Sequence, residues 1–530
     1  RRRIASSSMQ PNSAHDNDAN ELVDFRRQVE QRFPIPPVAF SADGSSVLLT
    51  GPLTLGLRIG GFAVVHADSG SNPVVIHVRE IRVEERPGPE MHYDAESDDN
   101  LGVPGTTLTV RLRGVAGQAV VLGRLVDRRF EPSSSTEPFG EQFLRAATPE
   151  EIGLVLDTLD RSADTIEVGR LRDVPALPAR LRSKGFSRHT FMCGQSGSGK
   201  TYTTGVLFER LIAGSTLPML ILDPNSDHVH LGELADPDDP SPQAQRYRAV
   251  ADQVVTVRAR GHEATHTLSV DFSDLDPDVQ AKLLRLHPIA DLDDFAELAR
   301  ITASLPTPYS IEDVARAASH DEKAAALANR IVNLRIDRWG LWRRDGEETI
   351  ATIDAASRRC VVIDTGSLTT PEERTALALA VLGRRWRGRR NRRPTLLAID
   401  EAHNVLPAST NDPLLQAATE IGTLIAGEGR KFGLHLFLAS QRPSKVHPNV
   451  LSQCDNLILM RMNGIDDIDD LQAAFSHVPP MLISESLGFG LGQALVAGPL
   501  APLPLLAQIG TRLTPEGGGD LPTTWTAAPT

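Results

Sequence analysis

The chain has 530 residues, of which 40% are hydrophobic and 23% are charged, as in ordinary globular proteins. This length predicts two to four domains, and no apolar run is long enough to cross a bilayer. The formal net charge of −13 argues against a general nucleic-acid coat protein, because such proteins need a positive field over much of their surface.

The three cysteines are widely spaced and form no CxxC pair, which argues against a disulfide framework and against a zinc site. They fit a reducing compartment, so we expect a cytoplasmic protein with no membrane partner. Residues 1–33 are polar and predict a flexible N-terminal segment, and residues 516–530 predict a flexible tail.

Residues 34–180 predict an N-terminal domain built mainly of strands. Runs rich in β-branched and small residues, separated by Gly, Pro, Asn and Asp, occur at 46–49, 62–66, 74–83, 106–112 and 119–126. Several short strands at this spacing predict a small β-barrel, and residues 85–105 predict a long acidic loop.

A connecting helix is predicted at the end of this domain. Thr148 is its expected N-cap, and Glu151 three positions later completes a capping box. The spacing of the apolar residues predicts an inward face made of Ile152, Leu154, Val155 and Leu159.

Residues 181–515 alternate apolar strands with helices, which is typical of a parallel α/β sheet. Buried strands are predicted at 190–193, 218–222, 360–363, 395–399, 434–439 and 456–460. Residues 275–335 are mostly helical in pattern, and we interpret them as a helical insertion at the edge of the sheet.

The sequence GQSGSGKT at 194–201 matches the phosphate-binding pattern G-x-x-x-x-G-K-[ST], between a predicted strand and a predicted helix. In such a loop, Lys200 reaches the β- and γ-phosphates and Thr201 ligates Mg²⁺. The alternative, a glycine-rich turn that matches by chance, is disfavoured by the strand and the helix on either side. The predicted ATP-binding residues are Gly194, Gln195, Ser196, Gly197, Ser198, Gly199, Lys200, Thr201 and Tyr202.

A second motif follows the strand at 395–399, where the acidic residues Asp400 and Glu401 come directly after an apolar run. We assign Asp400 to Mg²⁺ and Glu401 to the general base that polarises the attacking water. Acidic residues also commonly end a strand or open a helix, which is the structural alternative.

Other candidate functional residues, with a less specific sequence signal, lie near these motifs. Asp223 closes the strand at 218–222 and either orders water or metal, or caps a turn before Pro224. For His189 and His403 we favour an ordinary core or surface role over a functional one.

Five segments together resemble the HerA branch of the HerA/FtsK superfamily of P-loop ATPases: GQSGSGKT, ILDPNSD, LLAIDEAHNVLP, GEGRKFGLHLFLASQRPSKVHPNVLSQCDNLILMRM and GQALVAGPL. The resemblance covers residues 160–512, and residues 427–454 are its most specific part. It implies a RecA-like P-loop ATPase core that forms a hexameric ring, holds ATP between subunits and translocates double-stranded DNA. The predicted barrel resembles the N-terminal domain of this family.

The resemblance also implies roles for three further residues. Gln441 corresponds to a polar sensor of the γ-phosphate, while Arg430 and Arg188 correspond to arginines that reach toward a neighbouring subunit's nucleotide. Two segments depart from the family pattern. DPNSDH replaces DPHGEY at 223–228, which puts in doubt any role carried over to that loop, and Gly-Gln-Ala replaces Gly-Glu-Ala at 492–494.

The most concentrated basic run, RRWRGRRNRR at 384–393, predicts an exposed loop that leads into the strand before Asp400. Such a run is most often a solvated surface, and contact with nucleic-acid phosphates is the alternative.

We expect an ATP-driven ring motor on DNA, working with a separately encoded nuclease or effector in DNA end processing or anti-phage defence. One alternative is an ATP-sensing oligomeric scaffold that regulates an effector enzyme with little translocation, which the acidic total charge favours. A weaker alternative is a conjugation-type transfer ATPase, against which the predicted barrel argues.

Overall fold

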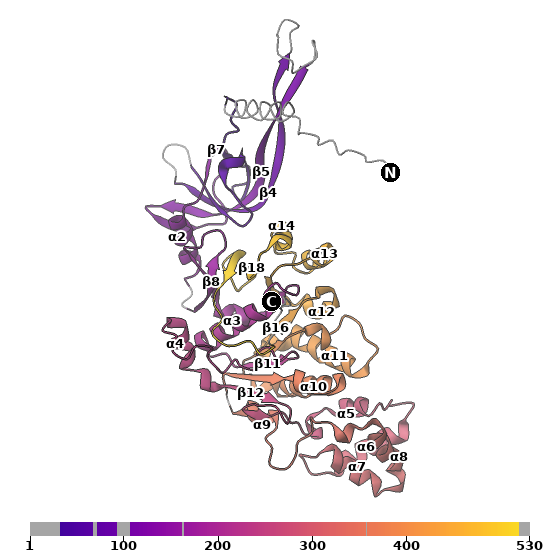
Figure 1. Ribbon diagram of the computed structural model, residues 1–530. Coiled ribbons are helices and arrows are strands. Elements are labelled where there is room, and N and C mark those ends of the chain that lie inside the picture. The colour runs from indigo at the N-terminus through magenta and orange to yellow at the C-terminus, as the bar shows by residue number, and fades with distance from the viewer. Residues whose placement is uncertain (1–31, 67–71, 93–106, 162–163, 357, 519–530) are drawn as a thin grey trace, which may run out of the picture. The chain divides into compact units, whose positions relative to one another are not determined.

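The computed structural model describes residues 32–66, 72–92, 107–161, 164–356 and 358–518 (Figure 1). The chain divides into two compact units, Arg1–Leu159 and Asp160–Thr530. The predicted flexible segments at 1–33 and 516–530 lie almost entirely outside the described residues. Within the described part, no helix combines the length and the apolar character needed to span a bilayer.

The first unit is an antiparallel sheet whose pairing closes on itself. Its strand order is β2-β1-β7-β3-β4-β5-β6, and β2 also pairs with β5. Side chains that alternate along the strands form its core, among them Val47, Leu49, Val65, Ile76 and Leu144. The strands are β1 (Val38–Ser41), β2 (Ser46–Pro52), β3 (Phe62–Val65), β4 (Val74–His92), β5 (Thr107–Val126), β6 (Arg129–Pro132) and β7 (Phe139–Ala146).

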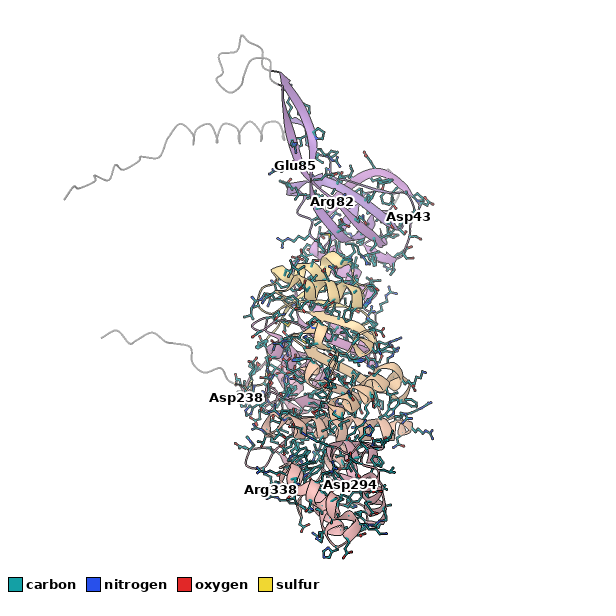
Figure 2. The ribbon with its side chains drawn as sticks, turned by 90° about the vertical axis from the view of Figure 1, so that its right-hand side faces the viewer. Asp43, Arg82, Glu85, Asp238, Asp294 and Arg338 are labelled. Carbon is teal, nitrogen blue, oxygen red and sulfur yellow. The ribbon has the colours of Figure 1, made fainter. Side chains whose placement is uncertain are left out.

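The predicted loop at 85–105 is wrong in its first part, because β4 runs to His92 and pairs with β5 along this length. The two strands predicted at 106–112 and 119–126 are one strand, β5. Gly117 resembles a turn signal in sequence, yet it stands where a Cβ would lie 2.2 Å from the Glu80 carbonyl oxygen of the paired strand. On this ribbon Glu85 pairs with Arg113 at 2.7 Å (Figure 2).

Helix α2 (Pro149–Leu159) ends the first unit, and its capping box is confirmed. The Glu151 backbone N–H donates to Thr148 Oγ1 at 3.3 Å, and the Thr148 N–H donates to Glu151 Oε2 at 2.8 Å. Ile152 and Val155 are buried as predicted, whereas Leu154 is 37% exposed, so its assignment to the inward face was wrong.

The second unit contains a 12-stranded sheet in the order β13-β12-β14-β11-β15-β16-β10-β17-β18-β19-β8-β9. The pairs from β13 to β17 are parallel, and those from β17 to β9 are antiparallel. The strands are β8 (Thr165–Leu171), β9 (Pro178–Arg182), β10 (His189–Cys193), β11 (Met219–Asp223), β12 (Val254–Arg258), β13 (His266–Thr267), β14 (Cys360–Asp364), β15 (Thr395–Ile399), β16 (Leu434–Ser440), β17 (Cys454–Leu459), β18 (Gln493–Ala497) and β19 (Leu505–Ile509).

The six predicted strands of this sheet are all present, with small shifts at their ends. The domain boundary differs from the prediction at 180/181. Strands β8 and β9 join the second sheet through β19, so the division between the units lies after Leu159.

Helices cover this sheet and extend beyond it at one edge (Figure 1). Helices α5 to α8 lie between β13 and β14 in the chain, and they form the helical insertion that the sequence predicted. The helices are α3 (Lys200–Gly214), α4 (Pro242–Arg248), α5 (Pro277–Leu283), α6 (Leu292–Ser304), α7 (Ile311–Ser319), α8 (Ala325–Leu334), α9 (Ile350–Ala355), α10 (Pro371–Arg387), α11 (Pro413–Glu428), α12 (Pro448–Leu451), α13 (Ile465–Ala474) and α14 (Pro480–Ser484).

The basic run at 384–393 is not a simple exposed loop, because its first part is the last turn of α10. Arg385 is mostly buried and pairs with Asp354, and Arg387 pairs with Asp276 at 2.6 Å. Arg389 stacks over the Trp386 ring with 4.1 Å between the guanidinium carbon and the ring centroid. Basic residues are favoured at a helix C-terminus, where the backbone carbonyls carry partial negative charge.

Candidate nucleotide-binding site

The loop at 194–199 connects β10 to α3, as predicted, and its glycines are required by its shape. Gly197 and Gly199 have φ values of +72° and +88°, a region that side chains disfavour. A Cβ on Gly194 would lie 2.8 Å from the Cβ of Met460. The loop therefore turns tightly at the N-terminus of a 15-residue helix, an arrangement suited to binding phosphate.

Lys200 is buried and contacts both acidic residues that follow β15. Its Nζ lies 2.8 Å from Asp400 Oδ1 and 3.0 Å from Glu401 Oε1. Burial acts to lower the pKa of Lys200, but the two carboxylates outweigh it and raise the pKa above its usual value. Burial likewise acts to raise the pKa of Asp400, and the ammonium group of Lys200 outweighs it, so this pKa is lowered.

Gln441 lies at the tip of β16, beside the strand that carries Asp400 and Glu401. Its Nε2 donates to Glu401 Oε1 at 2.9 Å, and the Gln441 backbone carbonyl accepts from Gln195 Nε2 at 3.3 Å. Glu401 has a φ of +46°, which is rare for a residue with a side chain and costs about 1 kcal/mol or more. The structure thus brings Lys200, Asp400, Glu401 and Gln441 together.

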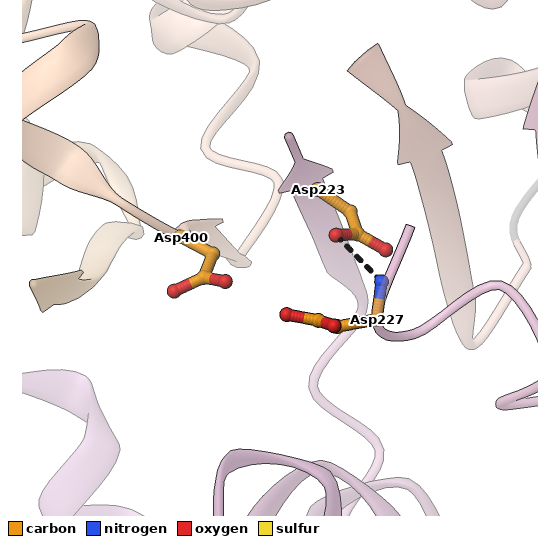
Figure 3. A group of neighbouring side chains, drawn as sticks. All are labelled: Asp223, Asp227 and Asp400. Carbon is orange, nitrogen blue, oxygen red and sulfur yellow. Dashed lines mark hydrogen bonds between the residues drawn. The ribbon is translucent and has the colours of Figure 1, made fainter. Parts of the chain in front are cut away.

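Asp223, Asp227 and Asp400 form a cluster of three carboxylates (Figure 3), and Asp400 is the one that contacts Lys200. One oxygen each from Asp223, Asp227 and Asp400 lies within 4.8 Å of the others, and Thr201 Oγ1 donates to Asp227 Oδ2 at 3.3 Å. Burial raises the pKa of Asp223 to about 7 and also raises that of Asp227, and the charge of Asp400 adds to both shifts.

This oxygen-rich cluster fits a hard divalent cation such as Mg²⁺. Asp400 Oδ2 is buried and has no hydrogen-bond partner within the part of the chain that the structure describes, and a cation would satisfy it. Asp223 also accepts the backbone N–H groups of Asp227 and His228, at 3.1 and 2.8 Å. The turn-cap interpretation of Asp223 is therefore confirmed. Its carboxylate is one of the three in the cluster, and a role in ordering water or metal stays a prediction. Asp227 is the acidic neighbour that the sequence reasoning left in doubt.

A pocket of about 730 Å³ opens over the loop and Lys200. Tyr202 lines it and is 37% exposed, while Gly194 and Ser198 are buried beneath it. The pocket is also lined by Leu491 and Gly492 just before β18, by the end of β19 and by the segment after it. A second pocket of about 790 Å³, beside α5 and the N-termini of α10 and α11, contains none of the predicted residues. The residues that line the first pocket are Gln195, Ser196, Gly197, Gly199, Lys200, Thr201, Tyr202, Gln441, Leu491, Gly492, Gln508, Ile509, Gly510, Thr511 and Glu516.

Arg188 and Arg430 are not part of this site. Both pair with Asp455, at 3.3 and 2.6 Å, and they precede β10 and β16 respectively. The loop at 194–199 follows β10, a five-residue strand that spans about 16 Å, so these arginines lie at the opposite edge of the sheet.

The two histidines differ in their surroundings. His189 is fully buried, with its ring between the Ala426 carbonyl at 3.0 Å and the Leu436 backbone N–H at 2.9 Å, which is the core role expected for it. His403 instead lies beside Glu401, with 3.4 Å between Nδ1 and Oε2. Sequence alone carried no signal for this contact.

Residues 166–382 match the family model for the central domain of helicase HerA. A protein described as a probable DNA double-strand break repair helicase HerA, from Methanocaldococcus jannaschii, is 34% identical over 129 residues, which are 24% of this chain and 25% of that protein. This alignment therefore spans a quarter of the relative's length. The DNA double-strand break repair helicase HerA of Sulfurisphaera tokodaii is 24% identical over 385 residues, 69% of this chain and 72% of that protein.

Among solved structures, VirB4 of Thermoanaerobacter pseudethanolicus aligns with a TM-score of 0.45 and 16% identity, over 66% of this chain and 97% of that chain. The family match falls within the unit that carries the phosphate-binding loop and the strand before Asp400. Residues 166–382, which include the phosphate-binding loop, are therefore similar to the central domain of HerA helicases.

Proposed function

We propose that the chain hydrolyses ATP in the pocket above Lys200. The observation that carries this proposal is the contact of one buried lysine with two adjacent carboxylates, Asp400 and Glu401, at the carboxyl end of a parallel sheet. A single structural ion pair would need only one of them.

Each residue has a separate task in this proposal. Phosphate oxygens attract the Lys200 ammonium group away from the carboxylates, which frees Asp400 and Glu401. Thr201 and Asp400 would hold Mg²⁺, which neutralises charge on the phosphates. Glu401 accepts a proton from the attacking water as general base, and Gln441, which donates to Glu401 Oε1, fixes its orientation.

We further propose that the active form is a homo-oligomer, and a hexameric ring in particular. Arg188 and Arg430 support this, because they lie across the sheet from the chain's own phosphate loop and can serve only the nucleotide of another copy. An arginine supplied by a neighbour stabilises charge on the transferring phosphoryl group.

The proposed substrate of the motor is double-stranded DNA. The support is the name of the relatives, which are described as DNA double-strand break repair helicases. In the basic run, Arg390 and Arg392 are exposed and available to phosphates. A separately encoded nuclease or effector, in DNA end processing or anti-phage defence, completes this proposal.

The test compares ATP hydrolysis by the wild-type chain with and without duplex DNA, and by a Lys200→Ala variant. We expect turnover that duplex DNA stimulates and that the variant lacks. Wild-type turnover that ignores duplex DNA, together with no duplex binding at low salt, would exclude the DNA motor but not the ATPase.

The ATP-sensing scaffold remains the second proposal, because a net charge of −13 favours protein partners over DNA. Displacement of a protein bound on duplex DNA separates the two functions. A motor removes this block when ATP is added, whereas a scaffold hydrolyses ATP and leaves the block in place.

A further inference from the structure

His403 lies close enough to Glu401 to control its position. It belongs to the short turn Ala402–Asn404 that follows β15, and its side chain is 19% exposed. The Nδ1 atom lies 3.1 Å from Ser440 Oγ and 3.4 Å from Glu401 Oε2. The β15–β16 register pairs Ile399 with Leu438, and this places Ser440 level with Glu401.

Hydrogen bonds around Ser440 determine where the imidazole proton lies. Ser440 Oγ donates its single hydrogen to the Arg442 carbonyl at 3.3 Å and accepts the Arg442 backbone N–H at 3.1 Å. The hydroxyl is then left as an acceptor toward His403, so the ring carries its proton on Nδ1. Burial lowers the pKa of His403, which keeps the ring neutral at pH 7.

The two carboxylate oxygens of Glu401 have different surroundings. Oε1 contacts Lys200 at 3.0 Å and Gln441 at 2.9 Å. Oε2 is buried and forms no hydrogen bond among the described residues, and His403 Nδ1 at 3.4 Å is within a few tenths of an ångström of one. When bound phosphates attract Lys200, Oε1 loses a partner, whereas the His403 contact with Oε2 does not depend on nucleotide.

We propose that His403 is a positioning residue for the general base: its single Nδ1–H, shared between Ser440 Oγ and Glu401 Oε2, holds the Oε2 side of Glu401 so that the carboxylate faces the attacking water. This inference rests on the proposed ATP hydrolysis. Because His403 acts on a group that works in the chemical step, its loss lowers kcat and leaves the KM for ATP unchanged.

The test uses three substitutions in the full chain. His403→Asn retains a polar nitrogen near the place of Nδ1, His403→Gln retains one near the place of Nε2, and His403→Ala retains neither. His266→Asn is the matched control, because His266 Nδ1 makes a similar contact, 3.1 Å, with Glu348 at the edge strand β13. Thermal unfolding and binding of a non-hydrolysable ATP analogue are measured for each protein, so that loss of fold or of nucleotide binding is seen directly.

We expect His403→Ala and His403→Gln to lower kcat by about tenfold or more with an unchanged KM, a smaller effect than loss of the general base itself. His403→Asn should retain most of the wild-type kcat, and His266→Asn all of it. Equal kcat for the three variants, whether high or low, would overturn the role of Nδ1, and so would a change confined to KM. Absence of ATP turnover by the wild-type chain would overturn both the proposed function and the role of His403. Normal wild-type turnover with equal kcat for the three variants would overturn only the role of His403.

Discussion

Gln441 provides a direct way to perturb the proposed base without touching the phosphate loop. The Gln441→Ala substitution removes the 2.9 Å hydrogen bond from Nε2 to Glu401 Oε1, while the backbone carbonyl that accepts from Gln195 remains. The change therefore affects the orientation of Glu401 and leaves the lining of the loop in place.

The magnitude follows from the kind of hydrogen bond that is lost. A hydrogen bond to a charged group contributes about 1.5–3 kcal/mol. If this contribution is present in the transition state, its loss lowers kcat by about 10- to 100-fold, since each 1.36 kcal/mol corresponds to a factor of ten. The affinity for ATP should stay within about twofold, because the hydrogen bond that Gln441→Ala removes is made to Glu401 and not to the phosphate-binding loop.

Steady-state ATP hydrolysis and direct nucleotide binding measure these two quantities. Gln472→Ala is the control: its side chain also makes hydrogen bonds, to the Pro480 carbonyl and Ser484 Oγ, but on α13 and α14. We expect full activity from the control. Weakened ATP binding with an unchanged kcat for Gln441→Ala would refute the reasoning, since it would make Gln441 a simple binding residue.

Three further predictions concern the loop, the arginines and the buried acid. Gly199→Ala forces a side chain into a backbone conformation with φ +88°. We expect the variant to lose about 1–2 kcal/mol of stability and to bind ATP more weakly. Gly427→Ala is the control in thermal unfolding, because a Cβ at Gly427 would meet open space. Arg430→Ala and Lys200→Ala should each be inactive alone, and mixing them should restore turnover if Arg430 serves a neighbour's site; no recovery in mixed assemblies would refute that role. Burial raises the pKa of Asp223 to about 7, well above that of an exposed aspartate, so between these values the folded state holds a proton that the unfolded state has lost. Without Mg²⁺, the stability of the folded state should therefore fall as pH rises from about 4 to about 7. Asp223→Asn should flatten this slope in urea unfolding, and an unchanged slope would contradict the assignment.

Much of the second sheet could be predicted because its central strands are buried on both faces. Segments such as 219–223 and 395–399 are nearly continuous apolar runs, which is how parallel strands appear in sequence. Strands β8 and β19 were among those missed, and only the pairing between them shows which unit β8 joins.

The site could also be predicted only in part, because some of its residues belong to local sequence patterns and others come together only through the fold. The loop at 194–201 and the pair Asp400–Glu401 are local patterns, and the structure places them together. The contacts of Thr201 with Asp227 and of His403 with Ser440 depend on loop shape and strand register, which no short stretch of sequence contains. For the same reason Arg385 was expected to be exposed, although its partner Asp354 lies on a different helix.

The account depends most on Glu401 as the general base, and the Glu401→Gln substitution tests it most directly. The amide keeps the size of the side chain and cannot accept the proton of the attacking water. We predict that this variant binds Mg²⁺ and ATP at least as tightly as the wild-type chain and shows single-turnover hydrolysis slower by at least about 100-fold. Hydrolysis at the wild-type rate with the same ATP affinity would contradict the assignment of Glu401, and with it the proposed mechanism.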